Sequence, residues 1–148
     1  MLRVAVVGLG KMGLSHYAIN NAHPEVEVVA VCDASTYTTD VLTKYTGIKA
    51  HADFDQLMAN ETFDAVVIAT PSKIHASMVK ACLEKGIHVF CEKPFTLDPA
   101  DAKELTELAD ARGLVNQVGY HYRFVGVFQA VKRLLDAKVI GDVTHVLA

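Results

Sequence analysis

A glycine-rich loop near the start of the chain restricts its fold more than any other feature of the sequence. Gly8, Gly10 and Gly13 form a G-x-G-x-x-G pattern that follows an apolar, β-branched run at residues 2–7 and opens a predicted helix at 12–21. In such a loop the first glycine allows a tight turn, the second lets a pyrophosphate approach the backbone, and the third lets the helix pack closely on the strand. A glycine turn with a purely structural role is the alternative at this point.

Apolar runs of strand length alternate with stretches of helical period along most of the chain. The strand runs are continuously apolar, which suits parallel strands that helices cover on both faces. This alternation predicts an α/β fold built on a doubly wound parallel sheet of the Rossmann type. The predicted strands are residues 2–7, 26–32, 49–52, 65–70, 87–91 and 114–118, and the predicted helices are 12–21, 35–45, 54–59, 73–85 and 99–112.

The pattern changes after Gly119. Residues 128–137 predict a helix, Gly141 and Asp142 a turn, and residues 143–148 a strand that has no neighbour in the sequence to pair with. We therefore predict a dinucleotide-binding domain at 1–120. It would be followed at 121–148 by the opening helix and first strand of a truncated α+β domain. The unpaired last strand argues against a stand-alone binding module.

An acidic residue closes the second predicted strand. Asp33 lies twenty positions after Gly13, where a carboxylate accepts hydrogen bonds from the hydroxyls of an adenosine ribose. A carboxylate repels a 2′-phosphate, and the next basic residue after Asp33 is Lys44, so NAD is favoured over NADP. The predicted cofactor contacts of this region are Gly8, Gly10, Lys11, Met12, Gly13 and Asp33.

Three further segments carry a family resemblance. They are Thr70-Pro71-Ser72-Lys73-Ile74-His75, Cys91-Glu92-Lys93-Pro94-Phe95 and Gly119-Tyr120-His121-Tyr122-Arg123-Phe124. Together with the glycine loop they resemble the Gfo/Idh/MocA family, the group of glucose–fructose oxidoreductase and inositol dehydrogenase. The resemblance implies a two-domain protein, whose second domain carries a large open sheet that holds the substrate and mediates contacts in a homo-oligomer.

The resemblance also implies roles for the residues of the first two segments. Lys93 would be catalytic, because an ammonium near the nicotinamide can polarise the reacting oxygen or hold the substrate; a solvated Glu-Lys pair is the alternative. Glu92 would lie against the cofactor ribose or nicotinamide, or be a simple surface charge. Thr70 and Pro71 would shape the loop on the adenosine side. His75 would either reach the cofactor edge or cap its helix.

The third segment is expected on the substrate side of the site. Tyr120, His121 and Arg123 would line that side, with Arg123 as an anchor for a polar or anionic group. Packing between the two domains is the alternative for all three. The general acid/base of the family, the histidine of a D-x-x-x-H pair, belongs to the second domain, and no histidine of this chain is a convincing replacement.

The implied function is hydride transfer between NAD and a secondary alcohol or ketone of a sugar, cyclitol or related polyol. The chain itself would bind cofactor without turnover. A dinucleotide-sensing regulatory protein of the same fold is the alternative.

Other sequence features indicate a cytoplasmic protein without nucleic acid, membrane or metal partners. The net charge is −3, and nucleic acid binding needs a concentrated basic face. No apolar run reaches the ~18–20 residues of a membrane span, and the N-terminus lacks the pattern of a signal peptide. The three cysteines and seven histidines show no metal-ligand spacing, so we expect buried, reduced thiols.

Overall fold

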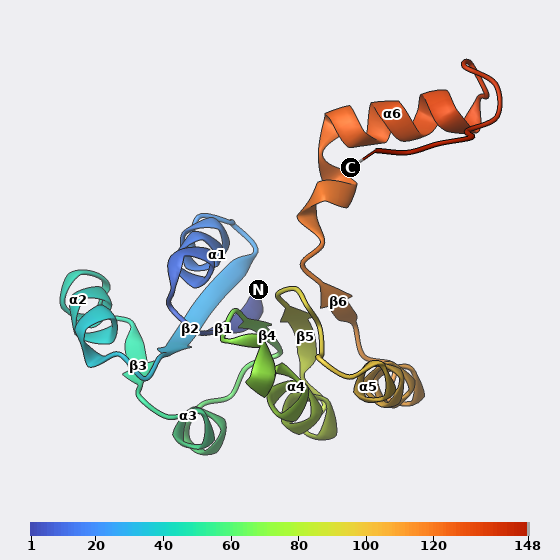
Figure 1. The fold of residues 1–148 in the computed structure, drawn as a ribbon. Helices are drawn as coiled ribbons and strands as arrows, with labels where there is room; N and C mark the ends of the chain where they lie inside the picture. The colour runs from blue at the N-terminus through green and yellow to red at the C-terminus, as the bar shows by residue number, and fades with distance from the viewer. Residues whose placement is uncertain (148) are drawn as a thin grey trace.

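A computed structural model describes residues 1–147, and a parallel six-stranded sheet forms its centre (Figure 1). The sheet order is β3-β2-β1-β4-β5-β6, so the order reverses between β1 and β4 and the sheet is doubly wound. This arrangement confirms the predicted fold class. The strands are β1 (Leu2–Val7), β2 (Val26–Cys32), β3 (Lys49–His51), β4 (Ala65–Ile68), β5 (His88–Cys91) and β6 (Asn116–Val118).

Helices cover both faces of the sheet (Figure 1). Helices α1 (Lys11–Asn21) and α2 (Thr36–Thr46) lie on one face. Helices α3 (Phe54–Asn60), α4 (His75–Glu84) and α5 (Pro99–Ala111) lie on the other. Two-sided cover is the reason why the strands are apolar at successive positions instead of every second one.

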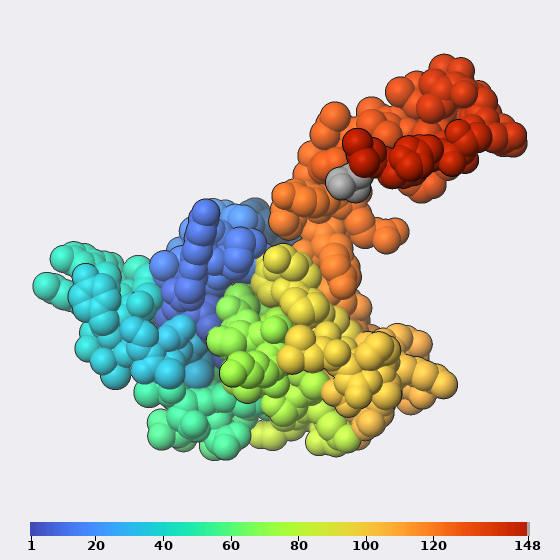
Figure 2. Space-filling view, viewed as in Figure 1, coloured from blue at the N-terminus to red at the C-terminus, as the bar shows by residue number. Residues whose placement is uncertain are grey.

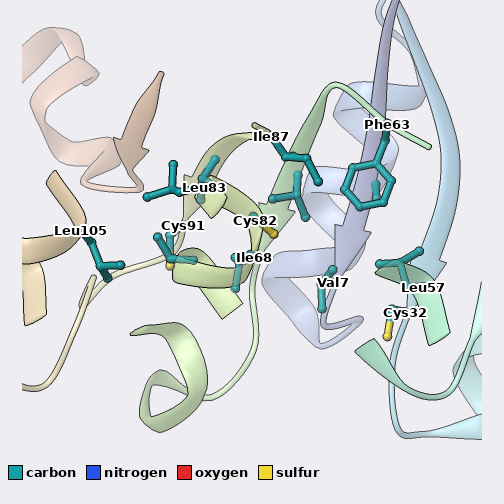
Figure 3. Close-up of a cluster of buried hydrophobic side chains, with 14 of the residues drawn as sticks. Val7, Cys32, Leu57, Phe63, Ile68, Cys82, Leu83, Ile87, Cys91 and Leu105 are labelled. Carbon is teal, nitrogen blue, oxygen red and sulfur yellow. The ribbon is translucent and has the colours of Figure 1, made fainter. Parts of the chain in front are cut away.

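Two hydrophobic clusters follow from the alternation of side chains along β1. Val4 and Val6 point toward α1 and pack with Tyr17, whereas Ala5 and Val7 belong to the larger cluster beneath α3, α4 and α5. Figure 3 shows that larger cluster. Its labelled members are Val7, Cys32, Leu57, Phe63, Ile68, Cys82, Leu83, Ile87, Cys91 and Leu105.

All three cysteines are buried and unpaired, as the sequence predicted. Burial raises the pKa of the Cys82 and Cys91 thiols to about 12. Burial, together with the carboxylates of Asp53 and Asp33, raises the pKa of Cys32 to about 11. A thiol reacts through its thiolate, so these three side chains serve as small apolar core residues.

Most predicted elements differ from the structure by one or two residues at an end, and two of the differences have a clear local cause. The helix predicted at 73–85 is a 3-10 turn at Ser72–Ile74 followed by α4, because the backbone of Ile74 leaves the helical region between them. The strand predicted at 114–118 begins only at Asn116. The Leu114 amide donates to Ala109 O, 2.9 Å away, and so belongs to the end of α5.

The C-terminal part lies away from the sheet (Figures 1 and 2). A 3-10 turn at His121–Phe124 leads into α6 (Gly126–Asp136), which begins two residues before the helix predicted at 128–137. None of its residues is buried. One side of α6 is an exposed apolar stripe formed by Val127, Phe128, Val131, Leu134 and Leu135.

The strand predicted at 143–148 is wrong for residues 143–147, and residue 148 lies outside the described residues. A positive φ at Lys138 and Gly141 turns the chain, which then returns along α6 without regular structure (Figure 1). A strand forms only where a neighbouring backbone accepts and donates its hydrogen bonds, and no described segment takes that place. Within residues 1–147 no helix has the length and apolar character needed to cross a membrane.

Candidate functional site

The glycine loop fills the space between the ends of β1 and β4 and the start of α1. Gly8 has a φ of +88°, and a Cβ there would lie 2.6 Å from the backbone carbonyl of Ala69. A Cβ on Gly13 would lie 2.7 Å from the carbonyl carbon of Gly8, so α1 packs directly on the loop. Gly10 is different, because a Cβ there would meet no atom of the described residues within 4 Å. The open side of the loop therefore lies over Gly10, where a pyrophosphate would approach.

The start of α1 offers backbone donors to such a group. Gly10 is the N-cap of α1, and no side chain caps this end of the helix. The first turn of a helix leaves N–H groups without partners inside the helix and carries a partial positive charge. Lys11 and Met12, which the sequence assigned to the cofactor, are exposed in this turn. The unpaired N–H groups and the partial positive charge at the start of α1 therefore fit a phosphate group.

A groove of about 640 Å³ runs over the loop along the carboxyl ends of the strands. Five predicted cofactor residues line or border it: Gly8, Gly10, Asp33, Thr70 and Pro71. Its remaining lining includes residues that the sequence did not assign to a site, among them Cys32, Asp53, Phe54, Ile74 and Met78. Dinucleotides bind in this crevice of a doubly wound sheet, at the point where the strand order reverses.

Asp33 is held at the end of β2 by two backbone amides. The Ser35 amide donates to Asp33 Oδ1 at 2.7 Å, and the Leu9 amide of the glycine loop donates to Oδ2. A carboxylate has about four acceptor positions, so Asp33 keeps acceptor capacity for a ribose hydroxyl. Asp53 caps α3, because its Oδ1 accepts from the Gln56 amide at 3.1 Å, and it also places a second carboxylate in the groove.

His75 joins the two loops that carry the family motifs. Its side chain is fully buried, with Nε2 2.9 Å from Thr70 O and Nδ1 2.8 Å from Pro94 O. The N-cap residue of α4 is Ile74. Direct contact of His75 with a cofactor stays a prediction, and its described contacts tie the loop after β4 to the loop after β5.

Lys93 lies in a second cleft of about 500 Å³, immediately after β5. The sequence placed Tyr120, His121 and Arg123 on the substrate side, and all three line this cleft with Lys93. Gly119 and Tyr122 complete the lining. The structure thus brings the predicted catalytic lysine together with the predicted substrate-side residues, although 26 positions separate Lys93 from Gly119.

Glu92 precedes Lys93 and is buried, with 7% of its surface exposed. Its Oε1 lies 2.8 Å from His16 Nε2 of α1, a residue that the sequence did not indicate. A surface charge, the alternative reading of Glu92, does not describe this residue. Its contact with cofactor ribose or nicotinamide stays a prediction. Among residues 1–147 no cluster of three or more His, Cys, Asp or Glu side chains has the arrangement of a metal site.

One groove of the doubly wound sheet lies against the glycine loop, the uncapped start of α1 and the carboxylate of Asp33. This arrangement defines a dinucleotide-binding domain of the oxidoreductase class. The model of the oxidoreductase family with an NAD-binding Rossmann fold, Gfo/Idh/MocA, matches residues 2–120. The chain belongs to this family, which confirms the resemblance seen in the sequence. NAD is the cofactor named for the family's fold, as predicted.

Relatives with dehydrogenase names resemble the chain over nearly all of its length. Inositol 2-dehydrogenase 1 of Saccharopolyspora erythraea is 38% identical over 146 residues, which are 95% of this chain and 43% of the relative. The scyllo-inositol 2-dehydrogenase (NAD(+)) of Bacillus subtilis is 32% identical over 142 residues, 95% of this chain and 42% of the relative. The chain thus spans about two fifths of the length of these proteins.

Solved structures agree with this assignment. The scyllo-inositol dehydrogenase of Lactobacillus casei, with bound NAD(H) and scyllo-inositol, superposes with a TM-score of 0.88 at 28% identity and covers 97% of this chain and 43% of its own. The WlbA dehydrogenase of Chromobactrium violaceum, in complex with NADH and UDP-GlcNAcA, has a TM-score of 0.84 at 29% identity, over 93% of this chain and 40% of its own.

Proposed function

We propose that the chain is the cofactor-binding half of a two-domain NAD-dependent dehydrogenase. It acts on a secondary alcohol or ketone of a cyclitol, sugar or related polyol. The observation that carries this proposal is the position of Lys93, which lies at the same carboxyl edge of the sheet as the groove over Gly10 but faces a separate cleft. One edge of the sheet therefore offers a place for a dinucleotide and a neighbouring place for a substrate. Inositol and nucleotide-sugar dehydrogenases among the relatives support the substrate class.

Different residues of the chain bind different parts of NAD. The first-turn amides of α1 hold the pyrophosphate over Gly10, and Asp33 accepts hydrogen bonds from the adenosine ribose hydroxyls. Thr70 and Pro71 form the wall of the groove after β4. When bound, NAD supplies the hydride chemistry of the reaction. We keep Lys11, Met12, Gly13, His75 and Glu92 as predicted members of the same site.

Lys93 donates a hydrogen bond from its ammonium group to the reacting oxygen of the substrate. Its side chain is exposed to the cleft, within reach of a polyol bound beside it. Tyr120 and His121 contact the substrate, and Arg123 anchors its polar or anionic group. The second domain covers this cleft, excludes water and supplies the general acid/base.

The second domain also accounts for the exposed apolar stripe of α6. Five large apolar side chains on one side of a helix face solvent in the described chain, whereas amphipathic helices normally bury such a side. We assign residues 1–120 to the dinucleotide-binding domain and 121–148 to the start of the second domain. We further propose that the two-domain protein is a homo-oligomer in the cytoplasm.

Turnover by the two-domain protein and by this chain alone tests the function. We expect NADH formation from NAD⁺ with at least one member of a panel of inositols and nucleotide sugars, but only in the two-domain protein. The 148-residue chain should bind NADH without turnover, because positioning worth several kcal/mol of the barrier is lost when the cleft stays open to water.

Two outcomes would contradict this proposal. Steady NADH formation by the chain alone would place the whole reaction within these residues. A two-domain protein that binds NADH but turns over no member of the panel would favour the dinucleotide-sensing alternative. The panel is measured in both directions, with NAD⁺ and the alcohols and with NADH and the corresponding ketones, so that the direction of the reaction does not bias the result.

A further inference from the structure

A buried carboxylate next to Lys93 accepts hydrogen bonds from α1 and from the loop after β5. Glu92 lies at the end of β5 and is 7% exposed. His16 Nε2, from the second turn of α1, donates to Glu92 Oε1 at 2.8 Å, because a carboxylate only accepts. The backbone amide of Lys93 donates to Oε2 at 3.3 Å. Both oxygens of Glu92 are thus engaged inside the protein.

Gly119 closes the third side of this carboxylate. A Cβ at Gly119 would lie 3.1 Å from both the carboxyl carbon and Oε1 of Glu92, so the glycine leaves just enough room for the buried side chain. Gly119 follows β6 and lines the cleft of Lys93. The His16 ring is itself fixed by an edge contact with Phe90, with ring centroids 5.0 Å apart.

We propose that His16 is a positioning residue, which acts through Glu92 to set the place of Lys93 relative to the glycine loop. Helix α1 begins at the glycine loop, and Lys93 follows the strand end that holds Glu92. The His16–Glu92 contact is therefore a direct link between the element that holds the dinucleotide phosphates and the lysine. This inference rests on the proposed function, since it presumes that Lys93 acts on the substrate.

The physical basis is the cost of leaving a buried carboxylate without its donor. A buried acceptor that loses its hydrogen-bond partner keeps the full penalty of desolvation, so Glu92 would move toward water when His16 cannot donate. The Lys93 amide would then lose its acceptor, and the lysine would no longer be fixed relative to α1. Displacement of a catalytic group by about 1 Å is enough to cost about a hundredfold in rate.

Three variants test the hydrogen bond to Glu92 separately from the size of the His16 ring. His16→Phe keeps an aromatic ring against Phe90 but removes the donor, and His16→Gln restores an N–H donor of similar reach. Gly119→Ala disturbs the same carboxylate from β6 without any change in α1, and the backbone of Gly119 does not require a positive φ. Ser15→Ala is the matched control, because the exposed Ser15 hydroxyl donates to Lys11 O of its own helix.

Two readouts distinguish positioning from general stability. The first is hydrogen exchange of the Lys93 amide in the 148-residue chain, measured with the unfolding midpoint and the NADH dissociation constant. For His16→Phe and Gly119→Ala we expect Lys93 exchange to accelerate about tenfold or more, beyond any change in global stability. The second is turnover of the two-domain protein, for which kcat should fall about tenfold to a hundredfold while KM for NAD changes less than about threefold. His16→Gln should recover most of both effects.

The proposal is overturned if His16→Phe leaves Lys93 exchange and kcat at their wild-type values, or if His16→Gln is as impaired as His16→Phe. If His16→Phe does not fold, His16→Gln and Gly119→Ala decide: wild-type Lys93 exchange and kcat in Gly119→Ala would then reject the link. A wild-type two-domain protein that turns over no member of the panel defeats the proposed function, and a Lys93→Ala protein that keeps its turnover defeats the catalytic role of Lys93 on which this inference rests. Loss of turnover in Lys93→Ala with normal turnover in His16→Phe defeats only the positioning role.

Discussion

Replacement of Lys93 by alanine is expected to lower kcat of the two-domain protein by about 10²–10⁴-fold, with NADH affinity within about twofold of wild type. We expect kcat to fall without a change in NADH affinity because the cleft of Lys93 is separate from the groove over the glycine loop. Lys93 lines the cleft with Tyr120, His121 and Arg123, whereas the groove over the glycine loop contains Asp33 and Thr70. Removal of the ammonium group is therefore expected to affect the reacting oxygen of the substrate and to leave the dinucleotide contacts in place.

Steady-state kinetics and a direct NADH titration of the same preparation measure the two effects separately. Lys103→Ala is the matched control, since Lys103 is an exposed lysine of α5 whose ion pair with Glu107, at 3.8 Å, lies one turn along the same helix. Turnover close to wild type in Lys93→Ala would show that Lys93 is a solvated residue without a catalytic role. A parallel loss of NADH binding would place Lys93 in the cofactor groove instead.

The second large effect is expected from Gly13→Ala. The added Cβ would lie 2.7 Å from the carbonyl carbon of Gly8, and backbone cannot move aside as a flexible side chain can. Helix α1 must therefore shift away from the loop, which we expect to lower the free energy of unfolding by about 1–3 kcal/mol. The same shift displaces the first-turn amides from the pyrophosphate. Loss of about 100-fold or more in NADH affinity, ~2.7 kcal/mol, should follow.

Two other glycines make this prediction specific. A Cβ on Gly10 would meet no described protein atom within 4 Å, so Gly10→Ala should keep the stability of the chain. It should still weaken NADH binding, because the methyl group would occupy the side of the loop that a pyrophosphate would approach. Gly126→Ala, at the start of α6, also meets nothing and should change neither quantity. Unfolding curves and NADH titrations of the three variants give both numbers. Wild-type binding by Gly10→Ala would exclude the loop as the phosphate site.

The bounds of the first two strands could be predicted to the residue. The bounds of β1 and β2 in the structure are those of the apolar runs, because Gly8 and Asp33 end each run with a residue that a buried strand does not favour. The residue types within each short stretch of sequence were sufficient to predict these bounds. The start of α5 is also as predicted, because Asp98 caps the helix through the Ala100 amide at 2.8 Å and Pro99 occupies its first turn, whereas the helix ends at Ala111, one residue before its predicted end.

Features that depend on partners far away in the sequence could not be predicted. His16 and Glu92 are separated by 76 positions, and neither residue type carries a local signal for the contact that the packing of α1 on the sheet creates. The predicted strand at 143–148 failed for a related reason, since an apolar run forms a strand only if another backbone pairs with it. Asp53 was not predicted as part of the groove, because that role depends on where the end of β3 lies beside β2.

The central claim is that the groove over the glycine loop binds NAD through Gly10 and Asp33, and a paired calorimetric titration of the 148-residue chain with NADH and NADPH tests it most directly. Two carboxylates, Asp33 and Asp53, line this groove, and none of its described lining residues is Lys or Arg. A 2′-phosphate would therefore meet like charge without a compensating cation. We predict that NADH binds at least about tenfold more tightly than NADPH, a difference of ~1.4 kcal/mol. Equal affinities, or tighter binding of NADPH, would contradict the place of the adenosine ribose beside Asp33.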